Sequence, residues 1–211
     1  MSISIFDHEL PDDSHNIYDV TFYDDQIRTL LTHSPSMVDS WILDIERINS
    51  RDLHSLVVGF DVEWRPNFQR NQDNPVATLQ LCVGRRCLIF QLIHAPNIPR
   101  SLVDFLSNQS YKFVGVGIDK DVEKLEDDYN LRVVNRVDLR GQAADALQNA
   151  SLRNAGLKAL AKEVLGLEIS KPKAITMSRW DHRWLTAPQV KYACLDAFVS
   201  FKIGRTLNAA S

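Results

Sequence analysis

Apolar positions near the N-terminus follow two different spacings, which predict a strand hairpin and then a helix. Residues 18–22 alternate between apolar and polar like a strand. Residues 26–31 can return beside them as a hairpin partner after a turn at Asp24-Asp25. Ser34-Pro35-Ser36 then opens a helix, because proline is favoured in a first helical turn. The apolar face of this helix is predicted to contain Met37, Trp41, Ile45 and Ile48.

From residue 56 onward the pattern changes from consecutive strands to alternating helices and strands. Residues 56–60 form an apolar run, and residues 76–83 and 87–93 predict two further strands around a Gly84-Arg85-Arg86 turn. These three strands are predicted to form an antiparallel meander. The elements expected afterwards are a short helix at 99–107, a strand at 112–116, a charged helix at 119–128, a strand at 133–139, a helix at 152–165 and a last helix from about 187 to 207.

The two helices at the C-terminal end have recognisable boundary signals. Gly166 ends the helix at 152–165, because glycine readily adopts the left-handed backbone that closes a helix. Thr186-Ala-Pro-Gln189 fits a capping box with proline in the first turn. Three strands followed by alternating helices and strands predict an α/β fold with a mixed sheet and flanking helices.

The length of 211 residues suits one main domain. We expect residues 1–54 to be an N-terminal extension, a hairpin plus a helix packed on a main domain at residues 55–211. The extension could cover a sheet edge or contribute to a subunit interface. No apolar run approaches the roughly 20 residues of a membrane span. The three cysteines belong to no CxxC motif and the N-terminus lacks a secretory signal, so an intracellular protein of the nucleus or cytoplasm is expected.

Charge is unevenly distributed along the chain. Residues 1–55 contain 11 acidic and 3 basic residues, a balance of −8, whereas residues 56–211 contain 16 acidic and 21 basic residues, a balance of +5. A moderately basic main domain suits a polyanionic partner, although a solvated surface explains the same numbers.

A pair of carboxylates follows the first strand of the main domain. Asp61 and Glu63 are two residues apart, so on a strand their side chains point to the same face. Two neighbouring carboxylates at the end of a core strand repel each other and lose hydration. A nearby cation must compensate them, or the strand has already left the core and both lie in water.

Two other segments contain acidic residues in suggestive positions. Asp119 and Asp121 follow Gly115-Val-Gly, where a strand leads into a helix, and Asp is also an ordinary helix-capping residue there. Tyr192 and Asp196 lie one turn apart on the last helix, which is also a common surface pairing. Taken together, the carboxylates are hard oxygen donors that suit Mg²⁺ or Mn²⁺, and two such ions can promote phosphodiester hydrolysis. The four candidate metal ligands are Asp61, Glu63, Asp121 and Asp196.

Three segments, FDVEW, VGVGIDKDVEKL and LTAPQVKYACLDA, resemble the exonuclease motifs of the DEDD family in order and spacing. The match is to its tyrosine branch, which includes ribonuclease D and the Werner-type 3′–5′ exonucleases. The resemblance extends over residues 55–208 and includes PVATLQLCVG and SRW. It implies a ribonuclease H-like (DnaQ-like exonuclease) fold and two-metal hydrolysis, with Mg²⁺ or Mn²⁺, from the 3′ end of single-stranded RNA or DNA.

The resemblance also implies a role for each matching residue. Asp61 would bridge two ions, Glu63 and Asp196 would complete the shell of the first, and Asp121 would hold the second. Asp121 is preferred to Asp119 because it aligns with the family aspartate. Tyr192 would orient the attacking water, and His182, the nearest rival, is expected to be an ordinary surface residue.

Basic and aromatic residues around the third motif are candidates for holding the nucleic acid, since a single strand needs cations for phosphates and flat surfaces for bases. Trp180 and Trp184 could instead be core anchors of a long loop, which is the favoured interpretation for each. The predicted nucleic-acid-binding residues are Trp64, Lys171, Lys173, Arg179, Trp180, Arg183 and Lys191.

Neither a helicase region nor the accessory helical domains of ribonuclease D occur in the sequence. The chain therefore resembles free-standing plant members of the family, some of whose relatives assemble as rings, so a homo-oligomer is a further expectation. The main alternative is a catalytically inactive nucleic-acid- or protein-binding module on the same fold. An endonuclease or integrase of the same broad fold is disfavoured by the Tyr-x-x-x-Asp pair.

Overall fold

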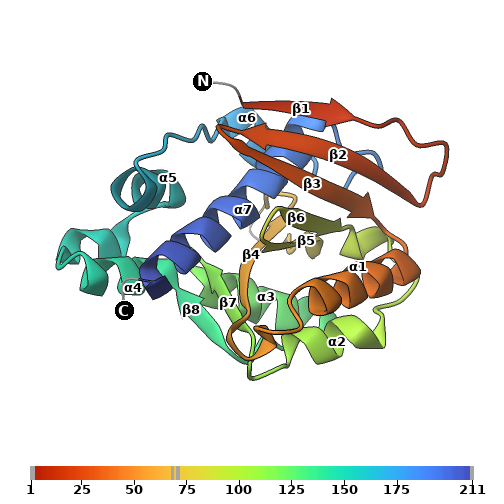
Figure 1. Ribbon diagram of the computed structural model, residues 1–211. Coiled ribbons are helices and arrows are strands. Elements are labelled where there is room, and N and C mark those ends of the chain that lie inside the picture. The colour runs from red at the N-terminus through yellow and green to blue at the C-terminus, as the bar shows by residue number, and fades with distance from the viewer. Residues whose placement is uncertain (1–2, 68, 70–71, 210–211) are drawn as a thin grey trace.

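The computed structural model describes residues 3–67, 69 and 72–209, which fold around one eight-stranded mixed sheet (Figure 1). The strand order is β1-β2-β3-β6-β5-β4-β7-β8. Neighbouring strands are antiparallel except in the pairs β3–β6, β4–β7 and β7–β8. The strands are β1 (Ile3–Asp7), β2 (His15–Phe22), β3 (Asp25–Thr32), β4 (Val57–Trp64), β5 (Val76–Val83), β6 (Arg86–Phe90), β7 (Lys112–Gly115) and β8 (Arg136–Asp138).

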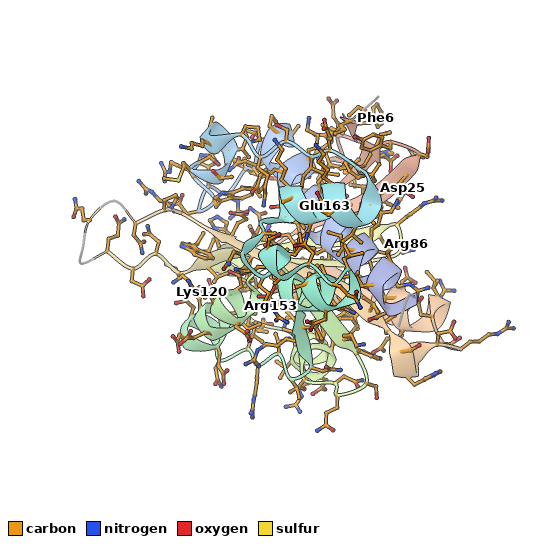
Figure 2. All side chains as sticks on the ribbon, turned by 90° about the vertical axis from the view of Figure 1, so that its left-hand side faces the viewer. Phe6, Asp25, Arg86, Lys120, Arg153 and Glu163 are labelled. Carbon is orange, nitrogen blue, oxygen red and sulfur yellow. The ribbon has the colours of Figure 1, made fainter. Side chains whose placement is uncertain are left out.

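Helices cover both faces of the sheet and divide the apolar core in two. One apolar cluster lies beneath α1, α2 and α3, and the other contains most of the buried side chains of α7 (Figure 1). Figure 2 views the side that carries α4 and α5, where Arg153 and Glu163 mark the two turns flanking α5. The α-helices are α1 (Pro35–Ile48), α2 (Arg100–Leu106), α3 (Ile118–Tyr129), α4 (Leu139–Ala146), α5 (Leu157–Leu160), α6 (Lys173–Thr176) and α7 (Ala187–Ala209).

The N-terminal strands extend the sheet of the main domain. β3 pairs in parallel with β6, so the β2–β3 hairpin and β1 continue the same sheet to its edge. The Asp25 carboxylate, at the hairpin turn, accepts hydrogen bonds from Arg85 at 2.8 Å and from Lys202 of α7 at 2.6 Å. The hairpin, the helix α1 and the antiparallel order β4–β5–β6 agree with the sequence prediction. The edge strand β1 was not predicted.

Three predicted elements differ from the structure. The strand expected to reach residue 93 ends at Phe90 and continues as a 3₁₀ turn, Leu92–His94. β8 ends at Asp138, because its side chain accepts a hydrogen bond from the Arg140 backbone N–H and caps α4, which was not predicted. The helix expected at 152–165 is broken into a 3₁₀ turn (Ala150–Asn154), α5 and a π-helical turn (Ala161–Leu165), after which Gly166 has a φ of +67° as expected.

The helix α7 crosses the sheet at two glycines. A Cβ atom at Gly59 of β4 would collide with the carbonyl oxygen of Ala197, and one at Gly204 of α7 would lie 2.9 Å from a methyl group of Val114. The absence of side chains at both positions therefore lets α7 lie directly against β4 and β7. The start of α7 matches the predicted capping box, since the Thr186 backbone N–H donates to the Gln189 side chain at 3.0 Å.

Replacing Gly59 by alanine is expected to lower the free energy of unfolding by about 3 kcal/mol or more, because neither backbone can yield without separating helix from strand. Urea unfolding followed by circular dichroism measures this effect. Gly156→Ala is the matched control, since a Cβ there meets no atom within 4 Å. Equal stability of the two variants would contradict the close packing of α7 on β4.

Candidate active site

The strand β4 holds Asp61 and Glu63 on one face of the sheet, and it remains paired as it does so. Asp61 lies opposite Gln80 of β5, and Glu63 lies opposite Thr78. The Oδ2 atom of Asp61 is buried and has no hydrogen-bond partner among the described residues. The strand has therefore not left the core, and the interpretation that both carboxylates lie in water is wrong.

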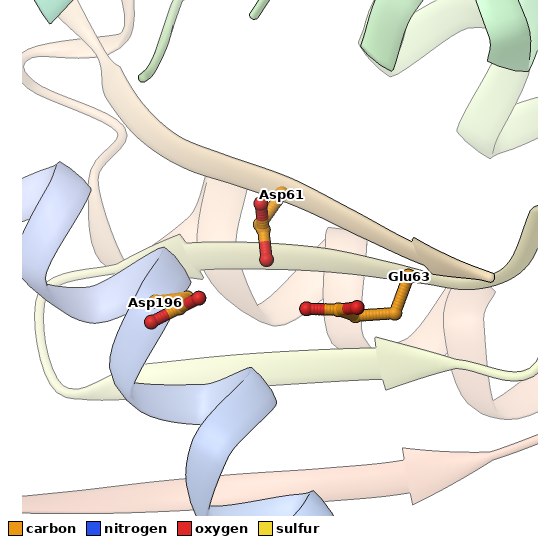
Figure 3. Close-up of side chains that lie close together, drawn as sticks. All are labelled: Asp61, Glu63 and Asp196. Atoms are coloured by element: carbon orange, nitrogen blue, oxygen red, sulfur yellow. The ribbon is translucent and has the colours of Figure 1, made fainter. Parts of the chain in front are cut away.

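The helix α7 brings a third carboxylate to the same point. Asp196 is 4% exposed and precedes Ala197, the residue that packs on Gly59. One oxygen each of Asp61, Glu63 and Asp196 lies within 4.8 Å of the other two. Figure 3 shows the three side chains converging from the strand and the helix. These three residues are called the carboxylate cluster below.

Asp121 approaches the carboxylate cluster from the first turn of α3. The turn that leads there is made by Gly117, whose φ of +72° favours glycine and whose N–H donates to Asp138 at 3.2 Å. The charge of Asp121 contributes to raising the pKa of both Asp61 and Glu63. Asp119, the alternative weighed from the sequence, is exposed and ion-paired with Arg136 at 2.7 Å.

Burial and mutual repulsion make the ionised state of these carboxyls unfavourable. The pKa values of Asp61 and Glu63 lie well above the ordinary range, first because burial removes hydration and then because Asp196 is close. Burial also raises the pKa of Asp196, against the lowering effect of Lys171. At Asp121, burial raises the pKa to about 7. Such a cluster is a strong attractor for cations.

A lysine supplies the cation that the sequence analysis required. The Lys171 Nζ atom lies 2.6 Å from the Asp196 Oδ2 atom, and 5.2 Å from the centre of the Tyr192 ring. Its pKa is raised because the charges of Asp196 and Asp61 outweigh its loss of hydration. The sequence predicted Lys171 only as a contact for nucleic acid, because a loop position gives no sign of which way its side chain turns.

Tyr192 is held rigidly beside the cluster. It is 7% exposed and lies one turn before Asp196 on α7. Its ring centre lies 6.0 Å from that of Trp180, which is completely buried and donates its indole N–H to the Thr176 carbonyl at 3.4 Å. The prediction that Trp180 contacts nucleic acid is therefore wrong, and its alternative as a core anchor is confirmed.

The other predicted nucleic-acid contacts are mostly on the surface. Trp184 is 55% exposed, so the core-anchor interpretation is wrong for this tryptophan, and the Arg183 guanidinium lies 5.6 Å from its ring centre. The Trp64 ring is partly exposed, with the Lys124 Nζ atom 5.7 Å from its centre. His182 is exposed, as expected. Lys173 and Arg179 are also exposed, and Lys191 is partly buried.

Two polar residues beneath the carboxylate cluster were missed by the sequence analysis. Thr78 and Gln80 are fully buried on β5, where the Gln80 Nε2 atom donates to the Thr78 hydroxyl at 2.6 Å. The Oε1 atom of Gln80 has no partner among the described residues. Two polar positions alternating within the otherwise apolar strand VATLQLCV were the available signal, because a buried strand rarely accepts such residues without a polar site.

The donor set fits a hard divalent cation. Asp61, Glu63 and Asp196 offer only oxygen ligands, which Mg²⁺ and Mn²⁺ prefer, and the unpartnered Oδ2 atom of Asp61 has a lone pair available. A single ammonium group cannot satisfy all three carboxylates. The geometry therefore agrees with metal binding.

The metal-free protein is expected to lose stability as the pH rises from about 4 to about 7. Below its ordinary pKa of 3.8, Asp121 is protonated in both the folded and the unfolded chain, so its burial is not opposed by charge. Between 3.8 and its folded value of about 7, only the unfolded chain has released the proton. The free energy of unfolding then falls by up to about 1.4 kcal/mol per pH unit for one such group.

Urea unfolding in EDTA across this range measures the dependence, and Asp121→Asn should reduce its slope. Asp119→Asn is the control, since that carboxylate is exposed. A stability that rises with pH, or an identical slope in Asp121→Asn, would contradict the expectation.

Among the described residues, no helix combines the length and the apolar character that crossing a membrane requires.

Known proteins share these features of sequence and fold. A family model described as "3'-5' exonuclease" matches residues 38–210. The chain is 36% identical over 164 residues to the mouse bifunctional 3′–5′ exonuclease/ATP-dependent helicase WRN, covering 77% of this chain and 12% of that protein. It is 30% identical over 186 residues to an Arabidopsis thaliana 3′–5′ exonuclease, covering 86% of this chain and 64% of that protein.

Solved structures agree with the sequence matches. The crystal structure of the EXD2 exonuclease domain soaked in Mg and GMP aligns with a TM-score of 0.50 and 28% identity, covering 86% of this chain and 88% of that one. The predicted α/β fold of the ribonuclease H-like type, with a mixed sheet and flanking helices, is thereby confirmed. With a family model matched over most of its length and the carboxylate cluster in place, the chain belongs to the 3′–5′ exonuclease family.

Proposed function

We propose that the chain is a Mg²⁺- or Mn²⁺-dependent 3′–5′ exonuclease of the tyrosine branch of the DEDD family, acting on single-stranded ends of RNA or DNA. The observation that carries the proposal is the convergence of oxygen atoms from Asp61, Glu63 and Asp196, with Tyr192 one helical turn away. The branch is assigned on Tyr192, because none of the six histidines occupies its position.

Two divalent ions are part of this proposal. Asp61, Glu63 and Asp196 would hold one ion, and Asp61 together with Asp121 would hold the other. Bound ions supply positive charge that stabilises the developing negative charge of phosphodiester hydrolysis. The four carboxylates, once ionised, balance the charge of two divalent cations. Bound cations would offset the burial that raises the pKa values of Asp61 and Asp121, and the repulsion that further raises that of Asp61.

Tyr192 orients the attacking water in this proposal. Burial and the neighbouring carboxylates raise the pKa of its phenol, so the hydroxyl keeps its proton and acts through hydrogen bonding rather than as a base. The ring packs near Trp180 and cannot swing freely. The chain thus positions a neutral polar group one helical turn from Asp196, beside the carboxylate cluster.

The nucleic acid would lie along the exposed basic residues near the third motif. Lys173, Arg179, Arg183 and Lys191 are assigned to phosphate contacts, and Trp64 to stacking. The Arg179 guanidinium donates a hydrogen bond to the Asp181 carboxylate. The same carboxylate also pairs at 3.4 Å with Arg65, the residue after β4. These contacts are to the backbone and to the faces of bases, so low sequence preference is expected.

The chain spans only 12% and 64% of the two full-length relatives described above, so their activities are not transferred to it whole. We propose an exonuclease domain similar to that of small plant members of the family, located in the nucleus or cytoplasm. The three buried, unpaired cysteines suit such a reducing compartment. Assembly into a homo-oligomer is a further part of the proposal.

A catalytically inactive binding module is the second candidate, but intact carboxylates argue against it. Burying Asp61, Glu63 and Asp196 together opposes folding unless cations are bound, so a module without chemistry would be more stable without them.

Digestion of a 5′-labelled single strand is the decisive experiment, because it shows from which end the strand is degraded. With a 5′-labelled single strand and Mg²⁺ or Mn²⁺, we expect a ladder that shortens from the 3′ end, on RNA, DNA or both. Asp61→Asn should reduce turnover by at least about a thousandfold, a typical consequence of removing an essential catalytic group. Asp119→Asn is the control that should keep activity. Internal cuts would indicate an endonuclease, and binding without cleavage would indicate the inactive module.

Tyr192→Phe separates the role of the hydroxyl from that of the ring. Turnover should fall by about 10²-fold, while Mn²⁺ affinity and thermal stability change little, because the ring still packs near Trp180. Calorimetric Mn²⁺ titration and single-turnover kinetics measure the two effects. An unchanged rate would remove Tyr192 from the mechanism.

A further inference from the structure

Lys171 places a positive charge against Asp196, one of the proposed metal ligands. Its ammonium group lies 2.6 Å from the Oδ2 atom of Asp196, and its charge also acts on Asp61 and Glu63. The side chain is about one-third exposed, at 33%, whereas that of Asp196 is 6% exposed. The lysine therefore reaches from the surface into the carboxylate cluster.

The charges in the site do not balance while Lys171 is the cation. Asp61, Glu63, Asp121 and Asp196 provide four negative charges when ionised. Lys171 provides one positive charge among them, and the charges of Arg140 and Lys120 also act on Asp121. Two divalent ions would balance the four carboxylates without the lysine. Asp196 would then be a ligand of an ion, and the ammonium group would no longer be needed to neutralise it.

The segment that carries Lys171 is exposed and lies outside the helices and strands of the fold. Residues 170–174 are all exposed, and no α-helix or strand includes residues 166–172. The segment is anchored on one side by Ile169, which is 5% exposed, and on the other by α6. Moving Lys171 away from Asp196 therefore breaks no backbone pairing of a helix or strand, although it also removes the ammonium group from its place 5.2 Å from the Tyr192 ring centre.

We propose that Lys171 is an internal counter-ion of the metal-free site, that divalent cations displace it, and that the released ammonium group then binds a phosphate of the nucleic acid. This inference rests on the proposed metal-dependent function and adds a coupling to it. Because the ion frees the Lys171 ammonium group to bind a phosphate, metal binding raises the affinity of the protein for the single strand. By linkage, the bound strand raises the affinity of the protein for the metal by the same factor.

Amine acylation read by mass spectrometry tests the displacement directly. Short pulses of an acetylating ester are applied while Mn²⁺ is titrated, with Mn²⁺ binding followed in parallel by calorimetry. Labelling of Lys171 should be low in EDTA and rise severalfold with the Mn²⁺ isotherm. Lys173, exposed two residues away, is the internal control and should react equally throughout.

The second step tests whether the released Lys171 binds the nucleic acid. It uses a single strand whose 3′ end carries phosphorothioate linkages, which slow hydrolysis. Added to the Mn²⁺-loaded protein, it should protect Lys171 again. Continued full labelling while the strand is bound would overturn the phosphate contact.

Two variants test whether the ion pair between Lys171 and Asp196 opposes Mn²⁺ binding. Lys171→Met should tighten Mn²⁺ binding by at least about fivefold, because no ion pair has to be broken, whereas Lys173→Met should leave the affinity within about twofold. If calorimetry detects no Mn²⁺ binding to the wild type, the proposed function fails together with this inference. If Mn²⁺ binds while Lys171 labelling and the affinity of Lys171→Met remain unchanged, the inference alone fails.

Discussion

The close approach of α7 to β4 at Gly59 is the contact on which the site depends. The backbone of Ala197 lies where any larger residue at position 59 would place its Cβ atom. Asp196 is adjacent to Ala197 and Asp61 is two residues from Gly59, so the packing contact and the carboxylates share the same two short segments. The distance between the ligands is therefore set by backbone packing and not by flexible side chains.

Electrostatic strain in the metal-free site follows from this packing. Helix and strand bring the carboxylates together whether or not a cation is present, and burial raises their pKa values. The fold tolerates this because α7 buries apolar surface along its length and because Lys171 partly neutralises the cluster. Stability supplied by the core is thus used to hold groups that repel one another, an arrangement typical of sites prepared for a ligand.

Much of the fold was predictable from the sequence, because its strands and long helices have strong local signals. The capping box before α7 and the apolar runs of β4 and β5 placed the main elements correctly. The prediction of one helix at 152–165 failed because apolar spacing does not reveal that the 3₁₀ turn ends at Asn154 and that a new helix starts after Gly156. The strand β1 was missed because an edge strand is half exposed and has little apolar signal.

The candidate site was less completely predictable. Asp61, Glu63 and Asp196 were identifiable by their motifs, and the structure brings them together. The directions of the side chains in residues 166–186 could not be predicted from their motifs. Trp180 turns inward, Trp184 turns outward and Lys171 turns toward Asp196. These directions depend on contacts with distant segments, such as the Gln91 side chain that donates to the Arg183 carbonyl at 2.9 Å.

The two glycine contacts of α7 also determine where the chain can tolerate changes in length. Two contacts fix the position of the helix along the sheet: Ala197 lies against Gly59, and Gly204 lies against Val114. If the Gly204 contact is kept, one residue inserted or deleted between Ala197 and Gly204 would rotate Asp196 by about 100° about the helix axis, away from Asp61 and Glu63. Sequence appended beyond the helix would leave both glycine contacts in place.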